Sequence, residues 1–354
     1  MLDVITFGGI TNDIFIKTKA AKVISVKEHD YLTEYLAFDY GGKIYLDGIL
    51  NSPGGGGNNT AVAFARLGLQ VAFAGCIGQD EDGRKLMMNL KKEGVRTDFL
   101  QRVVDENTGL SVIINSFEGE RTAFSFRGAN NKLTKDVLDL SALIDTKWFY
   151  IPSLTGSSQY LLPELVNLAQ ENSIKVGCNP GLAQLKMGLS GLKKILSGIE
   201  VLVINKEEAE LLTGLRAKHR AVDESVCPIE IMKGEPWISD VRMIMRQIYE
   251  SGVKIIVVTE GIKGAQAYDG QNFYWLPVYP YAPIDTLGAG DSFAASFIAG
   301  RILNRQIEDC LKIASANASL VVRQFGAQPG LGKWDDVKTV IEENSQIGVL
   351  VEDN

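Results

Sequence analysis

The residues best suited to chemistry lie between Asp285 and Gly300, where Asp285-Thr-Leu-Gly-Ala-Gly-Asp291 runs into a series of small residues. Gly288, Ala289 and Gly290 come just before an expected helix. Several backbone N–H groups there would lack partners, and the helix dipole would favour negative charge beside them. Asp291 would then take a proton from a hydroxyl while the amides hold a phosphoryl group. The alternative is that Asp291 only caps the helix and that the glycines only make a tight turn.

A second glycine-rich segment, Gly54-Gly-Gly-Gly57, precedes Asn58, Asn59 and an apolar stretch that ends at Gly68. It lacks the G-x-G-x-x-G spacing of dinucleotide-binding loops, and the chain contains no G-x-x-x-x-G-K-[ST] phosphate loop. These absences disfavour a Rossmann-type or P-loop nucleotide site. Taken alone, the segment is explained by Asn58 or Asn59 capping a core helix.

Three further segments place polar residues or glycines after expected strands. Asp13 follows the strand at 2–7, Asn205 and Glu208 follow the strand at 201–204, and the loop 259–264 follows the strand at 255–258. Asn205 and Glu208 also have the spacing of a helix-capping box. Each segment is explained by a turn or a cap when taken alone. Ligands of parallel sheets, however, bind outside the carboxyl ends of the strands, where all three segments fall.

The elements that must position these residues alternate from residue 148 onward. Strands are expected at 148–151, 175–178, 201–204 and 254–259, with helices between them. Repeated βαβ units predict an α/β fold with a doubly wound, mostly parallel sheet flanked by helices. Two β-rich stretches, at about 14–52 and 100–127, are expected to form a small β-sheet lid. We expect one domain over residues 1–340 and a C-terminal tail at 341–354.

Composition excludes several classes of protein. The chain has 354 residues, of which 45% are apolar, and a net charge of −7, which argues against nucleic acid or an anionic membrane as a partner. It shows neither a run of about 18 apolar residues nor a secretory leader, so we expect a cytoplasmic protein. Four distant cysteines indicate neither a zinc site nor a disulfide framework. Only two histidines argue against serine–histidine hydrolase chemistry.

Asp285 to Gly300 resembles the second signature of the ribokinase-like (PfkB) carbohydrate kinases, and Gly54 to Gly68 is similar to their first. Both signatures and the motifs between them occur in the family's order, from about residue 3 to 333. The resemblance implies an ATP-dependent phosphotransferase that acts on a hydroxyl of a small sugar such as ribose or fructose. The alternatives are a nucleoside kinase, a sugar-acid kinase and, in a different class, an inactive sugar-binding sensor on the same fold.

For the acceptor side of the reaction, the resemblance implies a catalytic set and a substrate-binding set. In the catalytic set Asp291 is the general base, and the anion hole is formed by Gly288, Ala289 and Gly290. In the substrate-binding set, hydrogen bonds to sugar hydroxyls come from Asp13 and Asn59, and the hinge is formed by Gly54 and Gly55.

For the phosphate donor, the resemblance implies ATP and Mg²⁺. Magnesium and phosphate would be placed by Asn205 and, indirectly, by Glu208. The ATP phosphates and ribose would lie against Thr259, Gly261 and Gly264, and the adenine would lie close to Asn317. A monovalent cation, with K⁺ as the candidate, would be held by Asp285 and the backbone of Gly326 and Gly330.

Some features fall outside these motifs. Arg121 and Arg127 lie on or beside the lid strands; an exposed arginine is usually only solvated, but one pointing into the cleft would bind a substrate carboxylate or phosphate. Gly56 and Asn58 differ from residues that the family often has at these places. The segment 215–239 is longer than the usual family link, and it either shapes the nucleotide side or is a surface excursion. The lid strands also allow a homodimer.

Overall fold

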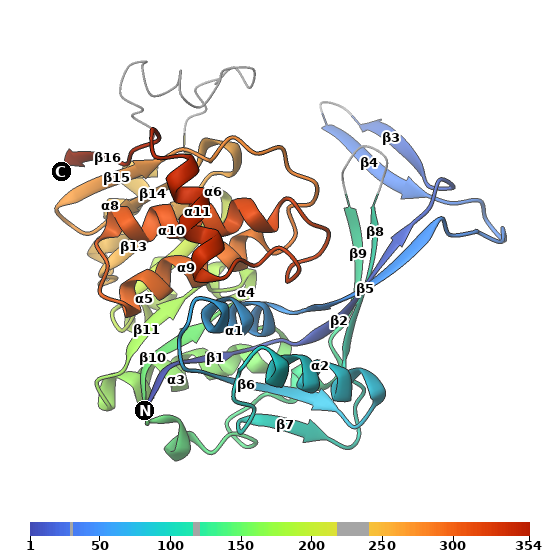
Figure 1. The fold of residues 1–354 in the computed structure, drawn as a ribbon, viewed down its shortest axis with the longest axis horizontal. Coiled ribbons are helices and arrows are strands. Elements are labelled where there is room, and N and C mark those ends of the chain that lie inside the picture. The colour runs from blue at the N-terminus through green and yellow to red at the C-terminus, as the bar shows by residue number, and fades with distance from the viewer. Residues whose placement is uncertain (29–30, 116–120, 218–240) are drawn as a thin grey trace.

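The computed structural model describes residues 1–28, 31–115, 121–217 and 241–354, and its largest feature is a ten-stranded sheet (Figure 1). The strands are β1 (Leu2–Phe7), β6 (Val71–Gly78), β7 (Leu100–Val103), β10 (Thr146–Ile151), β11 (Lys175–Cys178), β12 (Val201–Asn205), β13 (Ile255–Thr259), β14 (Ala265–Tyr268), β15 (Asn272–Leu276) and β16 (Leu350–Asp353). Their order is β16-β15-β14-β13-β12-β11-β10-β1-β6-β7. Neighbours from β13 to β7 are parallel, and β14, β15 and β16 extend one edge antiparallel.

Helices cover both faces of this sheet. One face carries α1 (Gly56–Arg66), α2 (Glu81–Lys92), α9 (Ala289–Ile302), α10 (Ile307–Val321) and α11 (Trp334–Glu343). The other carries α3 (Leu161–Glu171), α4 (Leu182–Leu185), α5 (Gly188–Leu196), α6 (Lys206–Thr213) and α8 (Val241–Glu250). Along β13, Val257 packs into the first layer while Ile256 and Val258 pack into the second. Burial on both faces explains why these strands read as continuous apolar runs, and it confirms the doubly wound architecture.

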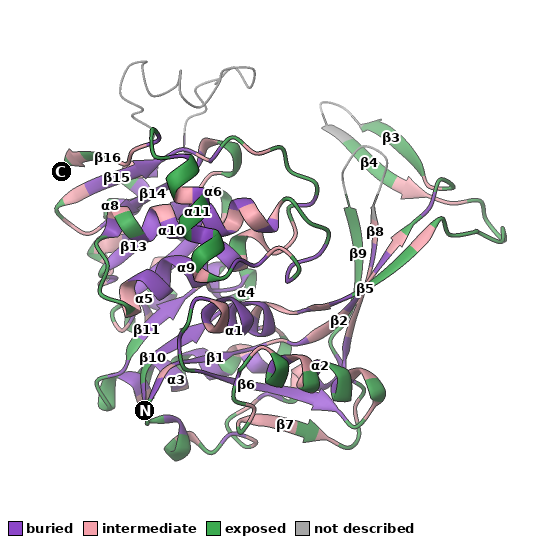
Figure 2. Ribbon diagram, in the orientation of Figure 1, coloured by how far each residue is buried: buried purple, intermediate pink, exposed green. Residues whose placement is uncertain are grey.

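A second, four-stranded sheet projects from this body as the lid (Figure 1). It consists of β2 (Thr11–Lys17), β5 (Gly48–Gly54), β8 (Gly109–Asn115) and β9 (Arg121–Phe126), in the order β5-β2-β8-β9. A separate hairpin of β3 (Lys22–Glu28) and β4 (Tyr31–Ala37) lies at its far end. Figure 2 shows that the body is largely buried, whereas most lid residues are exposed or half-buried.

The structure corrects two boundaries. Residues 100–103, expected in the lid, form β7 and pair with β6 at the edge of the main sheet, so the second lid stretch begins at residue 109. Residues 341–354, expected as a tail, complete α11 and supply β16, which pairs with β15. The open edge of β15 offers unpaired backbone groups, and the chain end satisfies them.

Two other expectations concern the long link and membrane-spanning segments. Residues 218–239 of the long link lie outside the described residues. None of the helices within the described ranges combines the length and the hydrophobicity needed to cross a membrane.

Candidate active site

Asp291 lies in the first turn of α9, behind a glycine whose backbone only glycine adopts easily. Gly288 has a φ of 79° and is the N-cap residue, and Ser292 N–H donates to its carbonyl at 2.9 Å. The first N–H groups of the helix therefore have no acceptor within it. Ala289 N–H makes one long hydrogen bond, 3.3 Å, to the Thr286 carbonyl, and a Cβ added at Gly290 would meet no atom within 4 Å. This helix start offers amides to open space, as an anion hole requires.

The Asp291 carboxylate is held by a residue from the other glycine-rich segment. Asn59 Nδ2 of α1 donates to Asp291 Oδ2 at 2.9 Å. Burial raises the pKa of Asp291, the negative charge of Asp13 raises it further, and the Asn59 hydrogen bond opposes both. A carboxylate with a raised pKa is suited to accept a proton near neutral pH. The alternative in which Asp291 only caps its helix is wrong, because Gly288 takes the N-cap position without a side-chain cap.

The helix-cap explanation of the first glycine-rich segment is also wrong. The N-cap of α1 is Gly55, with a φ of 91°, while Asn58 and Asn59 lie inside the helix. Any side chain on Gly55 would come within 2.5 Å of the Gly9 carbonyl oxygen. The backbone of this segment therefore lies directly against the loop after β1.

Asp13 is a buried carboxylate on the inner face of the lid, with its side chain beside β5. Thr11 Oγ1 donates to Asp13 Oδ1 at 2.8 Å, and Ser111 on β8 adds another hydrogen bond. Burial raises the pKa of Asp13 as well. Gly54 on β5 must be a glycine, because a Cβ there would overlap the Asp13 carboxylate. Asp13, Asn59, Gly54 and Gly55 thus meet near Asp291, whereas their hinge and sugar-binding roles stay predictions.

Asn205 and Thr259 lie opposite each other at the ends of neighbouring strands β12 and β13. The predicted capping box of α6 is confirmed: Asn205 Oδ1 accepts from Glu208 N–H at 2.7 Å, and Glu208 Oε2 accepts from Asn205 N–H at 2.9 Å. Burial raises the pKa of Glu208. A nearby cation would stabilise its charged form, so this pair fits the expected place for magnesium and phosphate.

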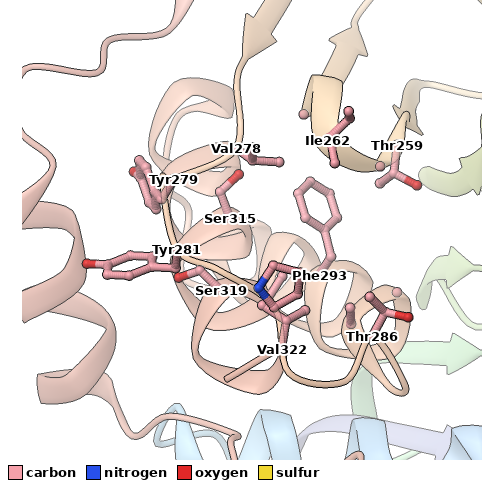
Figure 3. Close-up of a pocket in the computed structure, with 16 residues that line it drawn as sticks. Thr259, Ile262, Val278, Tyr279, Tyr281, Thr286, Phe293, Ser315, Ser319 and Val322 are labelled. Atoms are coloured by element: carbon pink, nitrogen blue, oxygen red, sulfur yellow. The ribbon is translucent and has the colours of Figure 1, made fainter. Parts of the chain in front are cut away.

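A cavity of about 340 Å³ lies between the strand-end loop after β13 and the start of α9. Thr259, Gly261 and Gly264 line it from one side, and Ala289 and Gly290 line it from the other. In Figure 3, Phe293 of α9 projects toward the loop that carries Ile262, and Tyr279 and Tyr281 come from the segment after β15. The cavity has the size and aromatic lining of a small-molecule site, and it extends from the expected ATP loop to the expected anion hole.

Asn317, predicted to lie close to the adenine, does not line this cavity. Asn317 is fully buried, its Nδ2 donates to Ser296 Oγ at 2.8 Å, and its Oδ1 accepts from Gly332 N–H at 2.8 Å. The Asn317 amide therefore joins α10 to α9 at one end, and at the other end it binds the loop that follows α10. The cavity is lined instead by Ser315, Ala318 and Ser319 of α10 and by Val322, the residue that follows this helix.

The two lid arginines differ in their surroundings. Arg127 is exposed just after β9, and its guanidinium lies near Gly156. Arg121 reaches the body of the protein, where Nη1 lies 3.3 Å from Asp285 Oδ1 and 3.0 Å from Thr286 Oγ1. Asp285 also accepts from Gly326 N–H at 3.1 Å, whereas Gly330 packs closely against Val321.

Three amide side chains with no role predicted from the sequence support the site. Gln328 Nε2 donates to Asn59 Oδ1 at 3.3 Å, and Asn89 Nδ2 donates to Gln328 Oε1 at 3.1 Å. Asn130 bonds both backbone groups of Ile10, accepting from its N–H at 3.0 Å and donating to its carbonyl at 2.9 Å. Single amides carry no periodic signal, so only their spatial partners could have revealed them.

Residues 28–334 match the model of the "pfkB family carbohydrate kinase". The chain belongs to this family. The activity that its members share is ATP-dependent phosphorylation of a carbohydrate, which agrees with a carboxylate and open helix-start amides close to a small-molecule cavity. The resemblance found in the two signatures is therefore confirmed, and so is the ribokinase-like fold.

Similar proteins include sugar kinases from several organisms. The chain is 29% identical over 296 residues to a ribokinase from Bacillus subtilis, covering 82% of this chain and 87% of the relative. It is 25% identical to an uncharacterized sugar kinase from Archaeoglobus fulgidus, covering 78% of this chain and 100% of the relative. Arabidopsis thaliana ribokinase complexed with ribose and ATP has the same fold, with a TM-score of 0.75 at 22% identity over 96% of this chain and 99% of that one.

Proposed function

We propose that this kinase transfers the γ-phosphoryl group of ATP to a hydroxyl of a small sugar of the ribose or fructose type. The observation that carries the proposal is the position of Asp291. This carboxylate, whose pKa burial raises, lies in the first turn of α9, next to Gly290, which lines the cavity of about 340 Å³. The named relatives that are ribokinases support the choice of a sugar as the acceptor.

In the proposed reaction, the acceptor hydroxyl lies against Asp291 and is oriented by Asp13 and Asn59. Asp291 accepts the hydroxyl proton as the oxygen attacks the γ-phosphorus. A new O–P bond forms, the bond from the γ-phosphorus to the β–γ bridging oxygen breaks, and ADP leaves with that oxygen. The amides of Gly288, Ala289 and Gly290 stabilise the negative charge on the moving phosphoryl group.

On the donor side, ATP would occupy the cavity, with its phosphates directed toward Thr259, Gly261, Gly264 and the start of α9. Magnesium, which neutralises phosphate charge when bound, would be placed by Asn205 and Glu208. A structural neighbour from E. coli, a putative ribokinase II, was solved in complex with ATP and Mg²⁺, which supports this pair of cofactors. We place the reaction in the cytoplasm, where ATP is supplied.

The acceptor side is lined by the inner face of the lid, so closure of the lid over the sugar would exclude water and prevent simple hydrolysis of ATP. Gly54 and Gly55 are the proposed hinge for this movement. Arg127 would contact the substrate from the end of β9.

We also propose that the outer face of the lid pairs with the same face of a second copy of this chain. Directly opposite residues of a sheet share a face, so the register places Phe124 beside Val112 and Ile14, and Ile49 beside Ile16. Phe124 and Ile49 are each 61% exposed. An apolar sheet face of this kind favours an isologous dimer, in which each copy covers the other.

The test is ATP-dependent phosphorylation of a panel of sugars, nucleosides and sugar acids, with wild type compared with Asp291→Asn. Loss of the base should reduce kcat by about 10² to 10⁴ on the acceptor that wild type prefers. Asp309→Asn is a matched control, because Asp309 is an exposed residue in the first turn of the neighbouring helix α10. Unchanged turnover by Asp291→Asn would refute the mechanism. Sugar binding without phosphorylation by wild type would favour a sensor.

A further inference from the structure

Arg121 forms an ion pair that joins the lid to the second signature. Its Nη1 lies 3.3 Å from Asp285 Oδ1 and 3.0 Å from Thr286 Oγ1. The Asp285 side chain is only 5% exposed, whereas the Arg121 side chain is 35% exposed. A carboxylate buried to this extent needs a compensating positive charge. In the described part of the chain, Arg121 is the side chain that forms an ion pair with Asp285.

The architecture of the lid directs Arg121 to this position. On the lid sheet Arg121 is opposite Asn115, and Asn115 is opposite Lys17, so these three side chains share one face. Side chains alternate along a strand, so the same face also carries Phe15 and Asp13 of β2. That face is turned toward the body, because Phe15 and Ser52 are the nearest neighbours of Gly326. Contact between Arg121 and Asp285 therefore follows from strand pairing, and it is made only when the lid lies over the body.

The surroundings of Asp285 do not fit the monovalent cation expected there. Besides Arg121, its carboxylate accepts from Leu287 N–H at 3.0 Å and from Gly326 N–H at 3.1 Å. In the loop expected to supply carbonyl ligands, the Gln328 carbonyl instead accepts from Arg66 Nη1 at 3.0 Å. A K⁺ ion at Asp285 would thus stand beside a guanidinium group and repel it.

We propose that Arg121 supplies the positive charge at Asp285 in place of a bound monovalent cation. Arg121 is then a positioning residue: by binding Asp285 and Thr286 it orders the loop that leads into Gly288 and the anion hole. Since the guanidinium belongs to a lid strand, the order of this loop is coupled to the position of the lid. This inference rests on the proposed kinase function, and it predicts a kinase that does not need K⁺.

The test compares initial rates in potassium chloride with rates in tetramethylammonium chloride at equal ionic strength. The initial rates of wild type in the two salts should differ by less than about twofold, because the Arg121 guanidinium already supplies the positive charge. Arg121→Gln should lose at least about tenfold in kcat/KM without K⁺, the cost of one charged hydrogen bond, and regain part of it in K⁺. Arg121→Lys should remain independent of K⁺. Arg96→Gln, which breaks an exposed ion pair with Asp98, is the matched control.

A second readout does not depend on catalysis. Thermal unfolding should show stabilisation by K⁺ relative to tetramethylammonium in Arg121→Gln and not in wild type. Activation or specific stabilisation of wild type by K⁺ would overturn the inference, and so would an Arg121→Gln variant that remains fully active without K⁺. If wild type phosphorylates no acceptor, the proposed function fails, and the unfolding comparison alone still decides whether Arg121 replaces the cation.

Discussion

Replacing Asn59 with leucine should move the pH dependence of the reaction toward alkaline pH. Leucine has nearly the same size as asparagine but cannot donate the 2.9 Å hydrogen bond to Asp291 Oδ2. That hydrogen bond lowers the pKa of Asp291, while burial and the charge of Asp13 raise it. Without Asn59 only the raising influences remain, so the pKa of Asp291 increases. The base is then protonated, and inactive, at pH values where the wild-type base is ionised.

The magnitude follows from the strength of a charged hydrogen bond. Such a bond contributes about 1.5–3 kcal/mol, which changes a protonation equilibrium roughly tenfold to a hundredfold. On the acid limb of the profile, kcat/KM of Asn59→Leu should fall below that of wild type by this factor. The difference should narrow as the pH rises above the pKa of Asp291 in both proteins, because both bases are then ionised.

The assay is kcat/KM measured across the pH range in which the protein stays folded, since this parameter reports the free enzyme. If Asn59 only contacted the substrate, its loss would lower kcat/KM by the same factor at every pH. The pH dependence of the ratio of wild-type to Asn59→Leu kcat/KM therefore separates a changed pKa of Asp291 from a lost substrate contact. Asp13→Asn should shift the profile in the opposite direction, because it removes the charge that raises the pKa of Asp291. Asn172→Leu, at an exposed helix end, is the matched control. A ratio of wild-type to Asn59→Leu kcat/KM that does not vary with pH would refute the reasoning.

Two further predictions concern the lid. Gly54→Ala should reduce kcat/KM by at least about tenfold, because the added methyl group overlaps the Asp13 carboxylate and must displace it. Gly348→Ala is the control and should match wild type, because its methyl group meets no atom within 4 Å. Equal activity of the two variants would contradict the argument. Phe124→Glu should convert the proposed dimer to a monomer in sedimentation experiments. The unfolding temperature should change little, since the Phe124 side chain is 61% exposed. A wild-type protein that sediments as a monomer at high concentration would exclude the dimer.

Local patterns in the chain predicted most of the fold because their causes are local. The strand at 2–7 coincides with β1, and the helix after Asn205 begins with its capping box. The boundary errors have a different cause. Residues 100–103 and 350–353 are short strands at sheet edges, and their membership depends on which neighbour has an open edge.

The sequence by itself determined the family and the class of reaction, and it predicted the principal residues. A glycine-rich turn followed by an aspartate at a helix start has a chemical meaning wherever it lies in space, and so does the order of the two signatures. The tertiary structure decided which residues act on each other. Asn59 meets Asp291 across 232 positions because α1 packs beside α9, and Arg121 meets Asp285 across 164 positions because the lid folds over the body. Such contacts depend on the crossing of distant elements, and no local spacing records them.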